Sequence, residues 1–196
     1  MKSKNFSACY RHSLAHILAK AVVELFGREN VKLGIGPQIQ EGFYYDFLLP
    51  RSLSPDDFKS IENKMREILK RKEDFVHREV SRDKALTEFA DQCFKKELIS
   101  ELPNNEVISI YDTGDDFKDL CRGPHVENSA ELLNCSFEIK SVSSAYWRGN
   151  ETGNILQRVY VFAFETKEDL KAHLQFLKEA KERDHKILGP QLDLFF

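Results

Sequence analysis

The chain has 196 residues, a net charge of −3, 41% hydrophobic residues and 31% charged residues. Its 15 phenylalanines and 6 tyrosines supply enough apolar surface for a core, which argues against intrinsic disorder. The small negative charge excludes a global field that would attract nucleic acid, and no apolar run is long enough to cross a membrane. The four cysteines form no C-x-x-C pair and no secretory apolar region is present, so we expect a reduced, cytoplasmic protein without disulfides.

The first predicted element is a helix over residues 7–27, for which Gly27 is a natural end. Its apolar residues recur at helical spacing: Leu14, Leu18, Ala21, Val22 and Leu25. Because the apolar surface continues nearly all round, we expect this N-terminal helix to be buried. His12 and His16 are four residues apart, so they lie on one face and would line an interior wall or cleft.

The middle of the chain alternates predicted strands and helices. Glycine and proline residues punctuate two expected strands within 31–48. Ser54-Pro55-Asp56-Asp57 is typical of a helix N-terminus, with a serine cap, a proline at the first position and acidic residues in the first turn. The elements expected next are a strand at 75–80, one or two helices within 83–98, and a strand at 106–111 that turns at 111–114.

The last third of the chain combines a loop, two strands and a helix. Gly123-Pro124 predicts an irregular backbone between Cys121 and His125. Two longer strands are expected near 135–147 and 155–164, followed by a helix at about 167–187 whose many Lys and Glu residues suit a linker or an exposed strut. This order predicts an α+β fold of two layers, in which a mostly antiparallel sheet packs against helices.

Two short clusters carry the chemistry of the chain. His12 and His16 on one helical turn, with Cys121 and His125 from a tight loop, form a spacing that zinc accepts. The same four side chains could instead hold and activate a water without a metal. An H-x-x-x-H pair alone is weak support, and the C-x-x-x-H pair in a Gly-Pro loop beside Asp119 strengthens it.

Five motifs occur together in a characteristic order: RHSLAH at 11–16, GIGPQIQEGFYYDF at 34–47, DLCRGPH at 119–125, AYWRG at 145–149 and RDHKILGPQLDL at 183–194. Together they resemble the amino-terminal editing (N2-type) region of bacterial-type threonyl-tRNA synthetases. The histidine and cysteine clusters are also similar to those of alanyl-tRNA synthetase editing domains, and AYWRG favours the threonyl branch. One departure is Phe94, where tyrosine is common in the family.

The resemblance implies a deacylase that hydrolyses the ester of mischarged seryl-tRNA(Thr). The catalytic positions that it transfers to this chain are His12, His16, Lys95, Asp119, Cys121 and His125, and the substrate-binding positions are Gly36, Tyr45 and Asp46. In this scheme His12, or a water ordered by His12 and His16, is the general base. Lys95, with Lys96 adjacent, activates the water or stabilises the oxyanion. Asp119 anchors the substrate ammonium, while Cys121 and His125 shape the pocket.

The resemblance also implies an arrangement of domains and partners. Residues 1–165 would be the editing domain and 166–196 a linker helix leading to an absent catalytic core, so the chain would be a fragment that does not make aminoacyl-tRNA. ATP and zinc would belong to that core, and the full-length enzyme would be a homodimer through it. The partner would be the acceptor end of tRNA(Thr) carrying serine. The isolated chain would bind tRNA weakly and with strong salt dependence. No membrane partner is expected.

Alternatives to this assignment remain. A metal-free editing site is favoured, and if zinc is bound its ligands would be His12, His16, Cys121 and His125. The chain could then be a zinc-dependent, alanyl-type trans-editing deacylase. It could also be a tRNA-binding module with no catalysis of its own.

Overall fold

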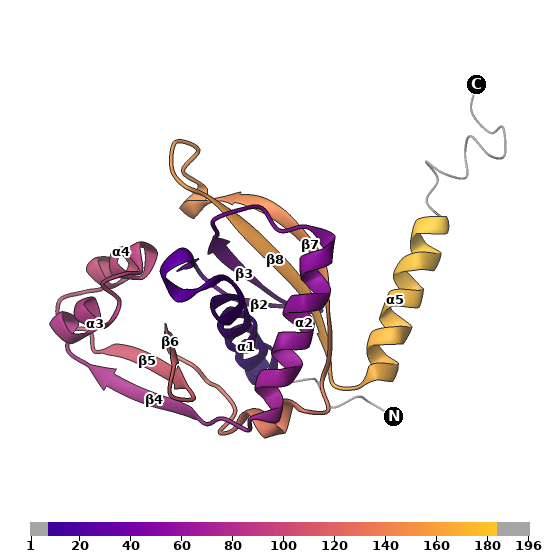
Figure 1. The fold of residues 1–196 in the computed structure, drawn as a ribbon, viewed down its shortest axis with the longest axis horizontal. Helices are drawn as coiled ribbons and strands as arrows, with labels where there is room; N and C mark the ends of the chain where they lie inside the picture. Colours follow the sequence, from indigo (N-terminus) through magenta and orange to yellow (C-terminus); the bar gives the residue numbers. More distant parts are fainter. Residues whose placement is uncertain (1–7, 184–196) are drawn as a thin grey trace.

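The computed structural model describes residues 8–183 (Figure 1). The predicted extension of the last helix to residue 187, and the motif at 183–194 beyond Arg183, lie outside the described residues. The α+β class is confirmed, with the strands divided between two antiparallel sheets. The described α-helices are α1 (Ala8–Phe26), α2 (Pro55–Lys70), α3 (Arg82–Glu88), α4 (Cys93–Glu101) and α5 (Lys167–Glu182).

The larger sheet has the order β1-β3-β8-β7, with β2 also paired to β3. Its strands are β1 (Lys32–Leu33), β2 (Gln38–Ile39), β3 (Gly42–Leu48), β7 (Ser136–Tyr146) and β8 (Ile155–Phe164). In the register of β3 and β8, Phe43 faces Val161 and Tyr45 faces Val159, and all four side chains are buried. These residues form one face of the sheet and pack in a single core with α1 and α2.

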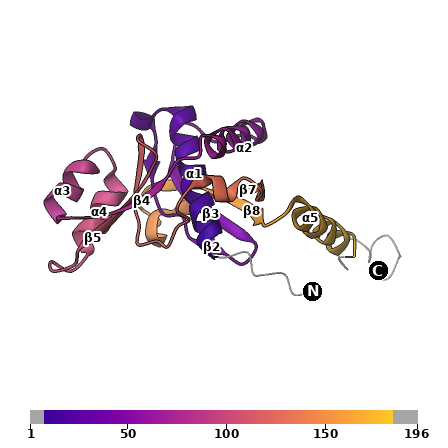
Figure 2. The same cartoon turned by 90° about the horizontal axis from the view of Figure 1, so that it is seen from below.

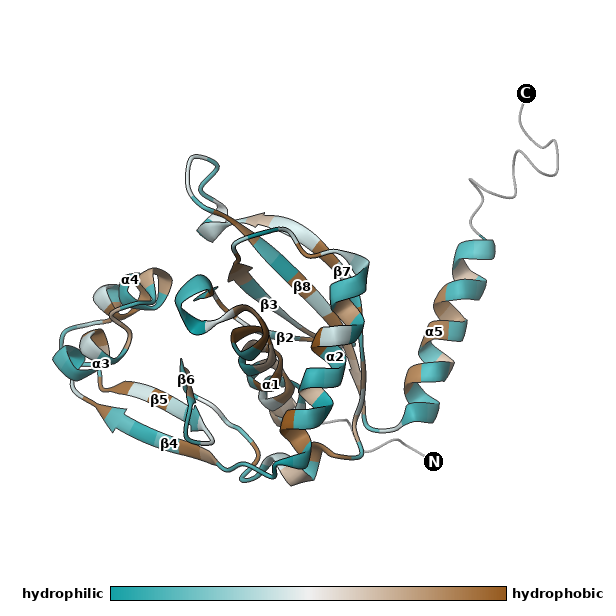
Figure 3. Cartoon of the chain, in the orientation of Figure 1, coloured by the Kyte–Doolittle hydropathy of each residue, from teal (hydrophilic) through white to brown (hydrophobic). Residues whose placement is uncertain are grey.

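Helix α1 lies at the centre of this core, as its apolar sequence predicts. Every residue from Ser13 to Val22 is buried, and the helix is drawn largely brown in Figure 3. Helix α2 covers the core with a narrower apolar stripe and leaves its polar face exposed. Its predicted N-terminus is confirmed, because Ser54 and Asp57 form a reciprocal capping box and Pro55 is the first helical residue.

The smaller sheet has the order β4-β5-β6 and consists of β4 (Phe75–Val80), β5 (Ile108–Thr113) and β6 (Phe117–Leu120). The predicted turn at 111–114 is wrong, since β5 continues to Thr113 and the chain reverses at Gly114, whose φ is 64°. Strand β6 is missing from the prediction. It has only four residues, and with Lys118 and Asp119 in the middle these do not alternate between apolar and polar, which is the pattern that predicts a strand.

Helices α3 and α4 pack on the smaller sheet through a second apolar cluster, which includes Phe89, Ile99 and Ile110. Helix α5 contacts β7 and β8 near its start and projects from the rest of the molecule in both views (Figures 1 and 2). Among the helices within residues 8–183, none is both long and apolar enough to cross a membrane.

Candidate active site

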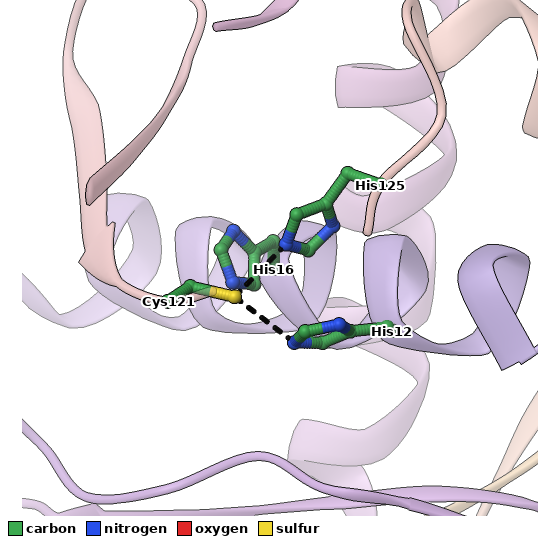
Figure 4. Close-up of side chains that lie close together, drawn as sticks. All are labelled: His12, His16, Cys121 and His125. Atoms are coloured by element: carbon green, nitrogen blue, oxygen red, sulfur yellow. Dashed lines mark hydrogen bonds between the residues drawn. The ribbon is translucent and has the colours of Figure 1, made fainter. Parts of the chain in front are cut away.

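Two segments that are far apart in the sequence meet at the candidate site. His12 and His16 project from α1, and the chain leaves β6 at Cys121. The left-handed backbone of Gly123 (φ 73°) turns the chain, so that His125 returns toward the sulfur. Cys121 Sγ lies 3.2 Å from Nε2 of both His12 and His125 (Figure 4). The predicted convergence of these four side chains, called here the histidine–cysteine cluster, is confirmed, since their ligand atoms lie within 4.8 Å of one another.

Ser13 holds one imidazole of the cluster in place. Its hydroxyl donates to the carbonyl oxygen of Cys9 (2.9 Å) and lies 3.1 Å from Nδ1 of His125. Because the hydroxyl has one proton, Nδ1–H of His125 donates to Ser13 Oγ, and Nε2 presents its lone pair to Cys121. Ser13 is absent from the predicted site residues; the available sequence signal is a lone hydroxyl in an apolar stretch between two histidines.

Burial keeps the cluster uncharged at neutral pH. It lowers the pKa of His12, and it lowers the pKa values of His16 and His125 further because each charged imidazole would repel its neighbours in the cluster, and Lys95 also repels a charge on His16. The same desolvation raises the pKa of the Cys121 thiol to about 11, although the amide of Gly123 donates to the sulfur. Neutral imidazoles are competent bases, whereas a protonated thiol is a poor nucleophile.

A buried triad of Lys95, Asp119 and Tyr45 adjoins the cluster. The Lys95 ammonium pairs with Asp119 Oδ1 and lies 3.3 Å from the Tyr45 hydroxyl, which donates to Asp119 Oδ2 at 2.5 Å. Burial and the Asp119 carboxylate raise the pKa of Tyr45, so its phenol keeps its proton. Lys95 is 2% exposed, whereas Lys96 points to solvent, so Lys95 is the lysine that the structure brings into the site.

His12, His16 and Cys121 of the cluster, together with the triad, line one cleft of about 390 Å³. Its walls come from α1, the loop at 35–38, Tyr45 of β3, α4, and the end of β6 with the loop that follows. Gly36 permits this shape, because a Cβ atom there would lie 2.2 Å from the ring of Tyr45. His125 is not part of the wall. It contacts the Cys121 sulfur and stacks on Phe75, with ring centroids 5.3 Å apart.

The structure does not place Asp46 at the cleft, which corrects its predicted substrate-binding role. Neighbouring strand residues point to opposite faces, so Tyr45 faces the cleft and Asp46 faces away. The Asp46 carboxylate instead accepts two hydrogen bonds from Arg158, at 2.7 and 2.8 Å. Gly36 and Tyr45, the other two predicted substrate-binding residues, do line the cleft.

Comparison with known proteins first indicates the class. Residues 108–160 match the family described as "Threonyl and Alanyl tRNA synthetase second additional domain". This segment spans β5 to most of β8 and includes Asp119, Cys121 and His125. This part of the chain is therefore similar to an additional domain that these two kinds of aminoacyl-tRNA synthetase share.

Similarity to individual proteins is more specific. The chain is 50% identical over 187 residues to threonine–tRNA ligase of Thermotoga neapolitana, covering 95% of this chain and 29% of that protein. It is 49% identical to the Geobacillus kaustophilus enzyme (94% and 28%) and 47% identical to the Thermus thermophilus enzyme (99% and 31%). The chain thus spans less than a third of these curated relatives, and its predicted resemblance to the editing region of threonyl-tRNA synthetases is confirmed.

Proposed function

We propose that this chain hydrolyses the ester that joins serine to the terminal ribose of mischarged tRNA(Thr). The observation that carries the proposal is the shared cleft, which is lined both by the ammonium of the buried triad and by the neutral imidazole of His12. Ester hydrolysis needs a base for water and a positive group for the oxyanion, and these two groups meet both needs.

The proposed reaction assigns each proton. His12 takes a proton from water, and the resulting hydroxide attacks the ester carbonyl to form a tetrahedral intermediate. An ammonium has three N–H donors, and Lys95 directs two of them to Asp119 and Tyr45, so one remains for the oxyanion. When the intermediate collapses, the imidazolium of His12 returns the proton to the leaving ribose oxygen.

Asp119 acts in this scheme mainly by holding Lys95. Oδ1 of Asp119 also accepts a hydrogen bond from the Leu120 amide at 2.8 Å, and Oδ2 accepts from Tyr45. Both oxygens are therefore engaged before any substrate binds. We propose that Asp119 attracts the substrate ammonium through its charge and fixes the catalytic lysine through its contacts.

We propose that selectivity for serine rests on steric exclusion of the threonine methyl group. Serine lacks one methyl group of threonine, and a pocket distinguishes such a group by only about 1–3 kcal/mol when it merely binds it. A rigid second site that clashes with the extra methyl can discriminate more strongly, because overpacking forces side chains out of their preferred positions. The buried, mutually bonded side chains of the triad give the cleft a wall of this kind.

A zinc-dependent deacylase is the second candidate, and one observation favours it. Three imidazoles and a thiol converge within 4.8 Å, and Nδ1 of His16 is buried without a hydrogen-bond partner among the described residues. This donor set fits zinc. Bound there, zinc would be held by the histidine–cysteine cluster and would lower the pKa of a coordinated water.

The arrangement of the longer protein is part of the proposal. Residues 1–165 would form the editing domain in the cytoplasm, with the segment from 166 leading toward a catalytic core that uses ATP and forms the homodimer. The acceptor end of tRNA(Thr) would reach the cleft from that core. The alternative is a domain that binds tRNA without catalysing deacylation, and a deacylation assay distinguishes the two.

The test is deacylation of purified seryl-tRNA(Thr) by this chain, with threonyl-tRNA(Thr) and seryl-tRNA(Ala) as competing substrates. Serine should be released from tRNA(Thr) at least tenfold faster than threonine, and Lys95→Ala should lower kcat about 10²-fold. Lys96→Ala is the matched control, because Lys96 is adjacent and exposed. No deacylation with retained tRNA binding would contradict the proposal. Stoichiometric zinc in protein purified without chelators, required for activity, would select the second candidate.

A further inference from the structure

Helix α4 presents Lys95 to the cleft from a position between the two sheets. The helix has nine residues, and Ile99 packs it against the smaller sheet. On another side Phe94 packs with Trp147 and with Leu156 of the larger sheet, in an apolar cluster separate from the main core. The placement of Lys95 therefore depends on contacts that α4 makes on both sides.

Trp147 and Arg148, which follow β7, contact one face of α4. Trp147 is 8% exposed, its ring centroid lies 4.6 Å from that of Phe94, and its indole N–H donates to both carboxylate oxygens of Glu97 at 3.0 Å. Arg148 pairs with Glu97 at 3.2 Å and also with Glu101. Residues 94, 97 and 101 follow the i, i+3, i+7 spacing of one helical face, so two neighbouring residues hold two turns of α4.

The backbone at this point is itself unusual. Arg148 has φ 55° and ψ 25°, a left-handed conformation that is rare for a residue with a side chain, and Gly149 follows with φ 74°. Such a conformation persists only where surrounding contacts hold it. Here the buried Trp147 precedes Arg148, backbone hydrogen bonds join Trp147 to Asn154 and Asn150, and Arg148 itself pairs with two glutamates of α4.

We propose that Trp147 and Arg148 form a clasp on α4 that positions Lys95 for deacylation. This inference rests on the proposed function of Lys95. Neither clasp residue lines the cleft, and the role assigned to both is exerted through α4. The contacts fix the helix along its length, and Lys95, next to Phe94, is thereby held against Asp119.

The first test does not need catalysis. Reductive dimethylation with formaldehyde and cyanoborohydride reads the accessibility of each lysine by mass spectrometry. In Trp147→Phe, which keeps a ring beside Phe94 but loses the indole N–H, labelling of Lys95 should become about tenfold faster, because local opening exposes it. Lys20 is the internal reference, since it is 1% exposed and paired with Glu73 and Asp116, away from α4. Unchanged Lys95 labelling, or equal acceleration at Lys20, overturns the clasp.

The second test asks whether the clasp acts through Lys95. Arg148→Ala should lower kcat for seryl-tRNA(Thr) about tenfold with KM within twofold, and Arg148→Lys should restore most of it. In the Lys95→Ala background the same change should have no further effect. An equal loss in both backgrounds overturns the proposal, whereas full activity of Lys95→Ala would refute the proposed function instead. Glu151→Ala, exposed in the same hairpin, should match the wild type.

Fluorescence separates the clasp from general damage to the fold. Trp147 is the only tryptophan, so its emission reports the clasp directly. Arg148→Ala should shift that emission while the unfolding midpoint stays that of Glu151→Ala. An unchanged emission together with an unchanged kcat would show that Arg148 does not contribute to the clasp.

Discussion

Removing Asp119 should destabilise the fold far more than removing an exposed acid. Lys95 and Asp119 side chains are 2% and 4% exposed, and Asp119 is the carboxylate that pairs with the Lys95 ammonium. Asp119→Ala leaves that ammonium buried, with the Tyr45 oxygen as its hydrogen-bond partner among residues 8–183. Taking one partner from a buried ion pair costs about 3–5 kcal/mol, because the remaining charge cannot regain its hydration. We therefore expect the free energy of unfolding to fall by about that amount.

A second variant checks the cause of this loss. In Lys95→Met/Asp119→Leu both charges are absent, and replacing a buried pair by apolar groups of similar size is often nearly neutral. The Tyr45 hydroxyl then loses its acceptor, which costs about 1–3 kcal/mol. The double variant should thus be more stable than Asp119→Ala, although it contains the greater change.

Urea unfolding, followed by circular dichroism and by the emission of Trp147, measures both variants. The slope against urea should stay constant, which shows that the change is in stability and not in the compactness of either state. Glu67→Ala is the control, because Glu67 is an exposed partner of Lys64 and Arg71, and it should leave the midpoint nearly unchanged. A cost below about 1 kcal/mol for Asp119→Ala, or a double variant less stable than the single one, would refute the reasoning.

Three further predictions concern the cleft. Because burial lowers the histidine pKa values of the cluster in the folded state, the unfolded state binds more protons below pH 6.5. The free energy of unfolding should therefore be highest above pH 6.5 and should decrease as the pH falls, by up to about 1.4 kcal/mol per pH unit for each histidine. Urea unfolding in the presence of EDTA measures this decrease. With a pKa of about 11, Cys121 should react with iodoacetamide at pH 8 at least tenfold more slowly than exposed Cys93, as mass spectrometry can follow. Gly36→Ala should displace the Tyr45 ring and lower kcat about 10²-fold in the deacylation assay.

Each of these has an outcome that would contradict it. Stability that is flat between pH 6.5 and 5 would mean that the cluster histidines protonate freely in the fold. Equal alkylation of Cys121 and Cys93 would indicate a thiolate in the cluster. Gly153→Ala is the control for the glycine, because a Cβ there meets its nearest atom at 3.2 Å in an exposed loop; an equal effect of both changes would remove the role assigned to Gly36.

The sequence predicts the parts of this site that local pattern determines. The apolar surface of α1 and the i, i+4 spacing of His12 and His16 depend on helix geometry alone, and both are confirmed. The convergence with Cys121 is predicted from the chemistry of the residues and from motif resemblance, because helical spacing says nothing about a segment a hundred residues away. The choice between Lys95 and Lys96 needs the structure, since adjacent helical residues differ by about 100° and only packing decides which is buried.

Asp46 shows that a motif can predict which segment lies near the site without predicting what each of its side chains does. It adjoins Tyr45 within the matching motif, yet the pleat of β3 sends the two side chains to opposite faces. Asp46 accepts hydrogen bonds from Arg158 of β8, which lies opposite it in the antiparallel register. That register joins residues more than a hundred positions apart, so no local pattern could reveal it.

The site finally depends on the register of β6, the strand that the sequence did not predict. Asp119 pairs with Tyr111 across the sheet, and Phe117 and Asp119, two positions apart, are the buried residues of the strand. A slip by one residue would turn Asp119 away from the cleft and leave the buried Lys95 without its carboxylate. The turn at Gly114 and the burial of Phe117 beside His16 oppose that slip. The same contacts that make this short strand stable therefore also set the charge of the cleft.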